Sequence, residues 1–471
     1  MVFSSLEFIF IFLTVFLLIY YITPKPIKNF VLLSGSLLFY SYGNLKQPAY
    51  ILLMLLSILV NYLLGRIIDS AGSAIVRKRW LIIGLFYNFS WLFLFKYLDF
   101  FIENINALLH GIGFSFTIPQ AELVLPIGIS FYTFQIVSYL ADVYRHKTKS
   151  EESVVRLGVY LCMFPQLIAG PIVSYPEISA SLKSRKVTAA DVEDGLRTFV
   201  MGLGMKVLLA NQLGRLWNEV NTIGFESIST QLAWLGIIAF SLQIYFDFYG
   251  YSLMAIGLGK LMGFQLPVNF RHPYAALSMT DFWRRWHITL GSWFREYVYI
   301  PLGGSRNGRL NMIRNTVIVW LCTGIWHGAS WNFVLWGIVL CLLILIEKAG
   351  LLKLLKRFPV IGHAYMCMAI PVSWLFFAVT DMGQIKLYLY KLFPFLGTSG
   401  KVLFAEDYLK YGKIYAVSLL VGLLFATPLP ARLYQRYRQK LPVILALFLI
   451  FWLSVYCLYI GMDDPFLYFR F

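Results

Sequence analysis

The sequence predicts an all-α integral membrane protein, because too few of its residues are charged to form a water-exposed surface. Of the 471 residues, 59% are apolar and 13% are charged, whereas a typical soluble domain has about 25% charged residues. The apolar residues gather in runs of about twenty, the length that a helix needs to cross the hydrocarbon core of a bilayer. We therefore predict one polytopic domain over residues 1–471, with about 10–12 transmembrane helices.

Apolar runs give the candidate membrane spans, and the loops between them set the orientation. The first run contains Phe8–Ile22 and has neither a basic segment before it nor a small-residue cleavage site. We expect an uncleaved membrane helix there rather than a signal peptide. Lysine and arginine are concentrated in alternate loops, which predicts an extracytoplasmic N-terminus. The candidate spans are 6–22, 30–43, 49–65, 80–98, 123–142, 195–213, 232–258, 364–380, 414–430 and 441–460.

The net charge of +17 would suggest a nucleic-acid partner in a soluble protein. Here the basic residues lie in short segments between apolar runs, which is typical of cytoplasmic loops. We therefore expect no nucleic acid, and expect contact with membrane lipid and with other anionic groups on the cytoplasmic side. The five cysteines lie in or beside apolar runs without a C-x-x-C pair, so we expect neither a disulfide framework nor a metal site.

Two stretches do not fit simple membrane crossings. Residues 153–171 are apolar but have basic loops on both sides, and they contain prolines and a glycine. We predict a re-entrant, non-helical segment at Phe164–Pro171 (FPQLIAGP), because broken backbone at membrane depth is tolerated only inside protein or against a water-filled cavity. Residues 313–346 are too long for one crossing and short for two. We predict a helical hairpin or a pair of short helices there, with Trp326–Asn332 (WHGASWN) near the turn.

A third stretch, Gly259–Asn315, is a long basic loop rich in tryptophan and tyrosine, as segments at a membrane interface are. Within it we predict an amphipathic helix over Thr280–Tyr297, with Thr280 as its N-cap. Such a helix would lie in the interface or line a cavity. Its polar face would carry Arg284, His287, Gly291 and Arg295, and its apolar face Trp283, Trp286, Leu290, Trp293 and Tyr297.

Two histidines are candidate catalytic residues. His327 would lie at membrane depth, where an ionisable residue is costly and therefore indicates function. Small residues on both sides would leave room for a substrate, and neutral imidazole can act as a general base. The alternative is a structural histidine bonded to a carbonyl. His287 would bind a donor phosphate, orient His327 or assist proton transfer, and its alternative is an interfacial position facing lipid headgroups.

Other polar residues in these regions have two interpretations each. Arg284, Arg285 and Arg295 are suited to holding phosphate groups through their forked donors, or they contact lipid headgroups. Asp247 lies in the middle of a predicted span, where it would serve transport or pair with an arginine of the adjacent loop. We favour the pairing. The chain has no Walker motif and no dinucleotide-binding glycine motif, which argues against an ATP-driven pump and a dinucleotide enzyme.

Several stretches resemble the membrane-bound O-acyltransferase (MBOAT) family, and specifically its alginate O-acetyltransferase-like bacterial members. They run in order over essentially the whole chain, and the RRWH and WHG motifs are the most specific. The stretches are Ser130–Arg145 (SFYTFQIVSYLADVYR), Phe164–Pro171, Gln243–Tyr251 (QIYFDFYGY), Pro267–Tyr274 (PVNFRHPY), Asp281–Arg306 (DFWRRWHITLGSWFREYVYIPLGGSR), Gly324–Gly337 (GIWHGASWNFVLWG) and Pro465–Phe471 (PFLYFRF).

The resemblance implies a funnel-shaped helical fold with re-entrant and amphipathic segments, in the cytoplasmic (inner) membrane of a bacterium. It implies acyl transfer to a hydroxyl, with the family's essential histidine at His327 and its second position at His287. It also implies a cytoplasmic thioester donor, acetyl-CoA or an acyl carrier protein, as co-substrate with no bound cofactor. The acetyl group would then pass to an extracytoplasmic partner of the SGNH-hydrolase-like class, which acetylates a polysaccharide.

Our first hypothesis is therefore a membrane O-acetyltransferase for an exported polysaccharide. His327 would take the proton of the attacking hydroxyl, and His287 would assist or orient it. The alternatives are D-alanyl transfer from a carrier protein toward teichoic acid, and a transporter or lipid-linked sugar flippase. Contacts to the donor or substrate are expected from Arg284, Arg285, Trp286, Arg295, Trp326, Asn332 and Asn269, and Trp326 and Trp331 are expected to form the wall of the reaction chamber.

Overall fold

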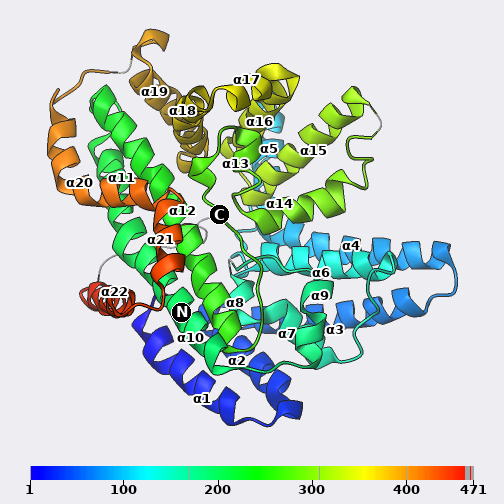
Figure 1. Cartoon of the computed structure of the whole chain (residues 1–471). Coiled ribbons are helices and arrows are strands. Elements are labelled where there is room, and N and C mark those ends of the chain that lie inside the picture. Colours follow the sequence, from blue (N-terminus) through cyan, green and yellow to red (C-terminus); the bar gives the residue numbers. More distant parts are fainter. Residues whose placement is uncertain (1, 169, 307, 399, 462–466, 468–471) are drawn as a thin grey trace. The chain divides into compact units, whose positions relative to one another are not determined.

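The computed structural model describes residues 2–168, 170–306, 308–398, 400–461 and 467 of the chain. Every regular element within these residues is a helix (Figure 1), which confirms the all-α prediction. Of the matching C-terminal stretch Pro465–Phe471, only Leu467 lies among the described residues.

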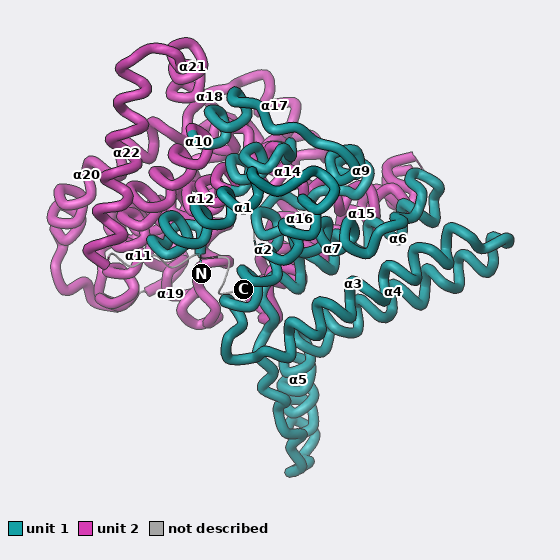
Figure 2. The backbone as a smooth tube through the Cα atoms, turned by 90° about the horizontal axis from the view of Figure 1, so that it is seen from below, with its two compact units in different colours: residues 1–196, 255–267 teal, residues 197–254, 268–471 magenta. Residues whose placement is uncertain are grey.

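The chain forms two compact units (Figure 2). Unit 1 consists of Met1–Leu196 and Ala255–Pro267, and unit 2 of Arg197–Met254 and Val268–Phe471. The helices α10 (Ala189–Gly204) and α12 (Thr230–Leu261) contribute residues to both units. The prediction of a single domain over 1–471 stays a prediction.

Unit 1 is built from the N-terminal helices. In this unit α2 packs against α7, α3 packs against α4 and α6, and α6 is buried along most of its length. The helices before α10 are α1 (Thr14–Ile22), which continues the π-helical turn Glu7–Leu13, α2 (Lys28–Gly43), α3 (Ala49–Ser70), α4 (Ala74–Lys96), α5 (Leu98–Gly111), α6 (Ile129–Tyr144), α7 (Val154–Cys162), α8 (Phe164–Leu167) and α9 (Tyr175–Lys183).

Unit 2 contains the helices that carry both candidate histidines. In this unit α15 and α16 pack side by side, and α16 also packs against α18. Besides the parts of α10 and α12, its elements are η3 (Met205–Ala210), α11 (Asn211–Ile223), η4 (Pro273–Ala275), α13 (Met279–Phe282), α14 (Ile288–Phe294), η5 (Arg295–Tyr299), α15 (Arg309–His327), α16 (Trp331–Ile346), η6 (Glu347–Leu351), α17 (Leu352–Arg357), α18 (Pro359–Ala378), α19 (Met382–Leu392), η7 (Pro394–Leu396), α20 (Asp407–Phe425), α21 (Leu429–Tyr437) and α22 (Leu441–Tyr459).

Several of these helices satisfy the length and composition of membrane spans. Among the described residues, α3, α12, α18, α20 and α22 are each long and apolar enough to cross a bilayer. The helices α4 and α5 together form a sixth candidate, bent by 64°. The prediction of about 10–12 crossings also counts shorter apolar runs, and it stays a prediction.

The predicted hairpin over 313–346 is confirmed. Helix α15 ends at His327 and α16 begins at Trp331, and the two helices touch at backbone distance. A Cβ atom on Gly324 would lie 2.5 Å from the carbonyl oxygen of Phe333, and one on Gly337 would lie 2.5 Å from that of Trp320. Only glycine allows this approach, so these positions set the spacing of the hairpin.

The prediction of a non-helical segment at Phe164–Pro171 is correct in part, and its re-entrant path stays a prediction. Helix α7 ends at Cys162, and the extended residue Met163 separates it from α8. Phe164–Leu167 were predicted to be non-helical but form one helical turn, because Pro165 stands at the start of the turn, where no backbone N–H is required. Gly170 and Pro171 are non-helical, as predicted, and Ala169 lies outside the described residues.

The predicted continuous helix over Thr280–Tyr297 is wrong. Helix α13 begins at Met279, with the Ser278 hydroxyl accepting the Asp281 N–H at 3.1 Å, so that Ser278 rather than Thr280 is the N-cap. It ends after one turn, and α14 begins only at Ile288. Between them His287 adopts a left-handed backbone conformation (φ 42°, ψ 53°), which a continuous helix does not contain.

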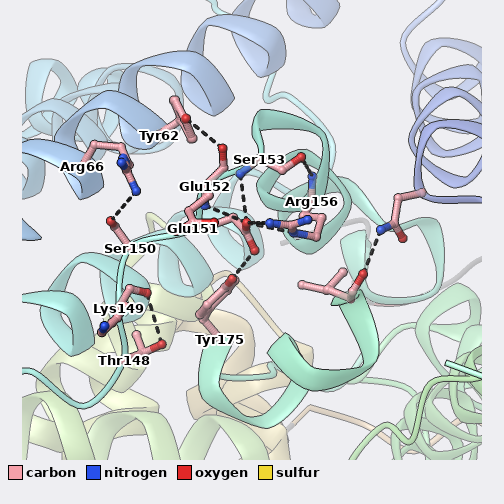
Figure 3. A network of polar contacts seen from close by, with 12 residues as sticks. Tyr62, Arg66, Thr148, Lys149, Ser150, Glu151, Glu152, Ser153, Arg156 and Tyr175 are labelled. Atoms are coloured by element: carbon pink, nitrogen blue, oxygen red, sulfur yellow. Dashed lines mark hydrogen bonds and ion pairs between the residues drawn. The ribbon is translucent and has the colours of Figure 1, made fainter. Parts of the chain in front are cut away.

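A polar network in unit 1 fastens the loop between α6 and α7 (Figure 3). The buried Glu151 accepts hydrogen bonds from Nε of Arg156 at 2.8 Å, from its Nη2 at 2.5 Å and from the hydroxyl of Tyr175. The backbone N–H of Ser153 donates to the same carboxylate at 2.9 Å. Beside it, the Tyr62 hydroxyl donates to the carbonyl of Glu152 at 3.0 Å. The loop is thereby tied to α3, α7 and α9.

The network holds the carboxylate of Glu151 in its charged form. Burial by itself raises the pKa of Glu151, but the hydrogen bonds from Arg156, Tyr175 and Ser153 and the charge of Arg156 outweigh burial, so that its pKa lies below the usual value of 4.5. The stability that this ionisation contributes is complete above pH 4.5 and is lost as the pH falls through the lower pKa of the folded state.

We expect Glu151→Gln to lower the melting temperature of the detergent-solubilised protein, because hydrogen bonds to a charged group stabilise by about 1.5–3 kcal/mol each. The matched control is Glu152→Gln, which changes the neighbouring, exposed carboxylate. The difference between Glu151→Gln and wild type should shrink as the pH falls below 4.5, measured by thermal unfolding. Equal melting temperatures for the two variants at pH 7 would contradict this role.

Candidate active site

His327 is the last residue of α15 and is buried, with 3% of its surface exposed. Its Nδ1 lies 2.7 Å from the carbonyl oxygen of Thr323. Because a carbonyl oxygen only accepts hydrogen bonds, Nδ1 carries the proton and Nε2 is the basic nitrogen of the neutral imidazole. The hydrogen bond to a carbonyl, which we expected of a purely structural histidine, is thus present. It also fixes the tautomer that a general base requires.

Aromatic rings surround His327. The ring centroids of Trp336, Trp326 and Phe377 lie 4.8, 4.9 and 5.6 Å from that of the imidazole. Trp331, in contrast, is 56% exposed, and its place in the wall of the chamber stays a prediction. It stands one residue after the extended N-cap Ser330, at the turn of the hairpin.

The small residues beside His327 do not leave empty space. A Cβ atom on Gly328 would lie 2.2 Å from the ring of Phe333, and Gly324 is the contact point of α15 with α16. The expectation that these residues leave room for a substrate is therefore wrong for both glycines, because α16 occupies the space. They position His327 by allowing the two helices to approach closely.

His287 is held by the amide of Asn269. This oxygen accepts from the Thr289 N–H at 3.3 Å and from its hydroxyl at 3.0 Å, which identifies it as the oxygen of the amide. It lies 3.1 Å from Nδ1 of His287, so Nδ1 is the donor and Nε2 the basic nitrogen. On its other side Asn269 donates to the Ser252 hydroxyl at 3.2 Å, which places the group against α12.

Backbone hydrogen bonds support the strained conformation of His287. The Ile288 N–H donates to the Asn269 carbonyl at 3.0 Å, and the Arg271 N–H donates to the Arg285 carbonyl at 2.9 Å. A left-handed conformation at a non-glycine residue costs about 1–2 kcal/mol. It persists here because the 269–271 segment is bonded to both sides of the turn, and such strain is characteristic of functional sites.

The fold brings the two histidines to one tryptophan. The ring of Trp326 lies 4.9 Å from that of His327 and 6.2 Å from that of His287. Burial lowers the pKa of the His287 imidazole well below its usual value, and the neighbouring His327 lowers it further. His287 is 1% exposed, which rules out the alternative of an interfacial histidine facing headgroups. Near neutral pH it is therefore an uncharged hydrogen-bond acceptor at Nε2.

The three arginines lie apart from this buried pair. Arg284 and Arg295 are exposed, and Arg285 forms a half-exposed ion pair with Asp281 at 2.7 Å. They do not share a face with His287, because the backbone turns sharply between α13 and α14. Their position at the surface suits an anionic headgroup or a donor phosphate equally, and contact with the donor stays a prediction.

Two other predicted contact residues are bonded within the protein. Trp286 is buried between Phe282 and Trp374, with ring centroids 5.5 and 4.9 Å away. Asn332 is fully buried, and its Nδ2 donates to the Phe376 carbonyl at 3.1 Å. Both therefore connect the histidine-bearing segments to α18, and a direct substrate contact stays a prediction for each.

Asp247 is paired, but with a different partner than expected. Its Oδ1 lies 2.6 Å from Nζ of Lys206, and both side chains are 2% exposed. The Leu467 N–H donates to Oδ2 at 2.9 Å, and Nζ of Lys206 also donates to Oδ1 of Asn211 at 3.3 Å. We predicted an arginine of the adjacent loop. The signal in the sequence is Lys206, the single lysine within the apolar run 195–213, which supplies the charge opposite the mid-span aspartate.

We expect Asn269→Ala to lower the melting temperature of the protein, because three donors lose their acceptor and a buried unsatisfied donor costs about 1–3 kcal/mol. Asn221→Ala is the control, since Asn221 is exposed and bonds only to the Trp217 carbonyl of its own helix. Thermal unfolding in detergent measures both. A loss no greater for Asn269→Ala than for Asn221→Ala would mean that this amide does not hold the site.

Comparisons with known proteins agree with this arrangement. The model of the family described as "MBOAT, membrane-bound O-acyltransferase family" matches residues 153–381. The chain is 36% identical over 384 residues to the probable alginate O-acetylase AlgI of Pseudomonas putida, covering 81% of this chain and 78% of that protein. It is 37% identical over 374 residues to the peptidoglycan O-acetyltransferase of Helicobacter pylori, with 72% and 69% covered.

A more distant similarity extends to the teichoic acid D-alanyltransferase of Streptococcus thermophilus. The identity is 27% over 242 residues, which is 48% of this chain and 58% of the relative. Both candidate histidines, His287 and His327, fall within the stretch that the family model matches. From the helical membrane architecture and from these similarities, we conclude that the chain is an acyltransferase and belongs to the membrane-bound O-acyltransferase family.

Proposed function

We propose that this membrane O-acyltransferase moves an acetyl group from a cytoplasmic thioester, acetyl-CoA or a carrier-bound form, toward hydroxyls of an exported polysaccharide. The observation that carries the proposal is the pair of buried histidines that share Trp326 and commit their Nδ1 atoms to fixed acceptors. The names of the relatives support acetyl as the acyl group, since the two at 36–37% identity are named for O-acetylation.

In the proposed reaction, an acceptor hydroxyl attacks the thioester carbonyl while Nε2 of His327 takes its proton. The carbon–sulfur bond then breaks, and the imidazolium returns the proton to the leaving thiolate. The products are an acetyl ester and a free thiol. A positioned general base accelerates such a step by about 10²–10⁴-fold. The single hydroxyl proton goes to His327, so His287, whose Nε2 only accepts, orients the site through the shared Trp326 rather than holding the same hydroxyl.

A buried donor beside His327 supports a carbonyl-bearing ligand. The indole N–H of Trp336 is completely buried and has no hydrogen-bond partner among the described residues. Its ring contacts the imidazole of His327 at 4.8 Å. A thioester carbonyl bound beside His327 would supply the missing acceptor, and an N–H donor strengthens as negative charge develops on that oxygen.

The remaining parts of the proposal concern location and partners. We propose that the protein acts in the bacterial cytoplasmic membrane, with the donor on the basic cytoplasmic side. An extracytoplasmic SGNH-hydrolase-like acetyltransferase would complete transfer to the polysaccharide. The transporter hypothesis rested on the broken helices and on Asp247, and the ion pair with Lys206 removes the second of these grounds.

The test is thiol release from acetyl-CoA by the purified protein in nanodiscs, with membranes that contain the native acceptor. We expect His327→Ala to lower kcat by about 10²–10⁴-fold. His363→Ala is the matched control, because this histidine is exposed on α18, and its kcat should equal that of wild type.

Three outcomes would change the proposal. Equal rates for His327→Ala and wild type would remove His327 from the chemistry. Wild-type turnover of a D-alanyl carrier protein, with none of acetyl-CoA, would favour the branch represented by the D-alanyltransferase relatives. No turnover of either donor would overturn the proposed function.

A further inference from the structure

A buried carboxylate that the proposed reaction does not use lies where α16 continues into η6. Glu347 has no exposed surface. Its Oε1 accepts the Met279 N–H at 2.5 Å, and its Oε2 accepts the Thr280 N–H at 2.8 Å and the Thr280 hydroxyl at 2.6 Å. These two N–H groups open α13, a position where the backbone donors have no acceptor within the helix.

This set of bonds is unusually specific for one side chain. A buried carboxylate is costly unless hydrogen bonds replace the water that it loses. Two consecutive residues on the segment that leads to His287 give Glu347 three donors, and the hydroxyl of Tyr365 on α18 also lies beside the carboxylate. Hydrogen bonds to an ionised acceptor are shorter and stronger than those between neutral groups. The contact therefore restrains α13 more firmly than apolar packing alone.

The same segment is held at a second point. Trp283 follows α13, and its ring lies 5.0 Å from that of Trp320 on α15 and 5.5 Å from that of Trp336 on α16. Trp336 in turn contacts His327. From its first N–H groups to Trp283, the segment is thus fixed on the hairpin that carries His327, and four residues later it reaches His287.

We propose that Glu347 is a positioning residue for acyl transfer, which rests on the proposed function. Its carboxylate fixes the start of α13 to the end of α16 and so holds the His287 turn in register with His327. The residue touches neither histidine and acts through the backbone of 279–287. A misplacement of about 1 Å at a reacting group can lower the rate about 100-fold. The contact between Glu347 and α13 can therefore control the rate without touching the reacting groups.

The kinetic test compares Glu347→Gln with wild type in the nanodisc assay. The glutamine amide has the size of the glutamate side chain. Its NH2 group, however, would face a backbone N–H of Met279 or Thr280, which needs an acceptor. We expect kcat to fall about 10- to 100-fold, because the geometry of the reacting groups changes.

A second background separates positioning from general destabilisation. In the His287→Ala protein the register of residue 287 no longer matters, so Glu347→Gln should lower kcat by less than about 3-fold there. A loss of the same size in both backgrounds would overturn the proposal, because Glu347 would then act independently of His287.

The matched control is Glu177→Gln in unit 1. Glu177 also accepts a backbone N–H and a hydroxyl, both from Ser174, at 2.9 and 2.8 Å, but it is exposed and lies at the start of α9. Its kcat should stay at the wild-type value. If Glu347→Gln does not fold, Thr280→Val removes one of the three donors and keeps the backbone bonds. We expect it to lower kcat about 3-fold, again only when His287 is present.

Amide hydrogen exchange of residues 278–287 provides a test that does not depend on enzymatic activity. Glu347→Gln should accelerate exchange in this segment, whereas Glu177→Gln should not. Unchanged exchange in Glu347→Gln would overturn the proposal whatever the kinetics. If wild type transfers no acyl group, the proposed function fails, and the exchange measurement alone then decides whether Glu347 holds α13.

Discussion

The geometry of the active site depends on one constraint: a fixed partner holds each of its buried ionisable side chains, and the same holds for the nearby buried ion pair. His327 meets the carbonyl of Thr323, His287 meets the amide of Asn269, and Lys206 meets Asp247. Burying such a group without a partner costs several kcal/mol. Each partner therefore determines not only that the group is tolerated but also which atom points where. The site is oriented before a substrate arrives, as electrostatic catalysis requires.

Local patterns in the sequence were sufficient for the helical class, for the hairpin over 313–346 and for the two histidines as candidates. They were not sufficient for the turn at His287. The apolar stripe of Thr280–Tyr297 has helical spacing, but the Asn269 amide and the backbone of 269–271 stabilise a left-handed residue in its middle. These contacts come from an earlier part of the loop, and periodicity within a window does not contain them.

The glycines around His327 illustrate a second limit. Small residues beside a catalytic candidate suggest space for a ligand, but here they allow Phe333 and the backbone of α16 to approach. Residue size indicates close contact without identifying what makes it. The same applies to Asp247, for which the sequence required a partner. The lysine that provides the charge is far away in sequence and belongs to another apolar run.

The ion pair between Lys206 and Asp247 has a consequence for an energised membrane. A single charge that moves across the full membrane potential gains or loses about 2.3 kcal/mol per 100 mV. An isolated carboxylate on α12 would be drawn along this field, and the helix with it. The pair has opposite charges 2.6 Å apart, so the forces on its two members nearly cancel. Helix α12, which also supports Asn269 through Ser252, therefore keeps its position whether or not the cell maintains a voltage.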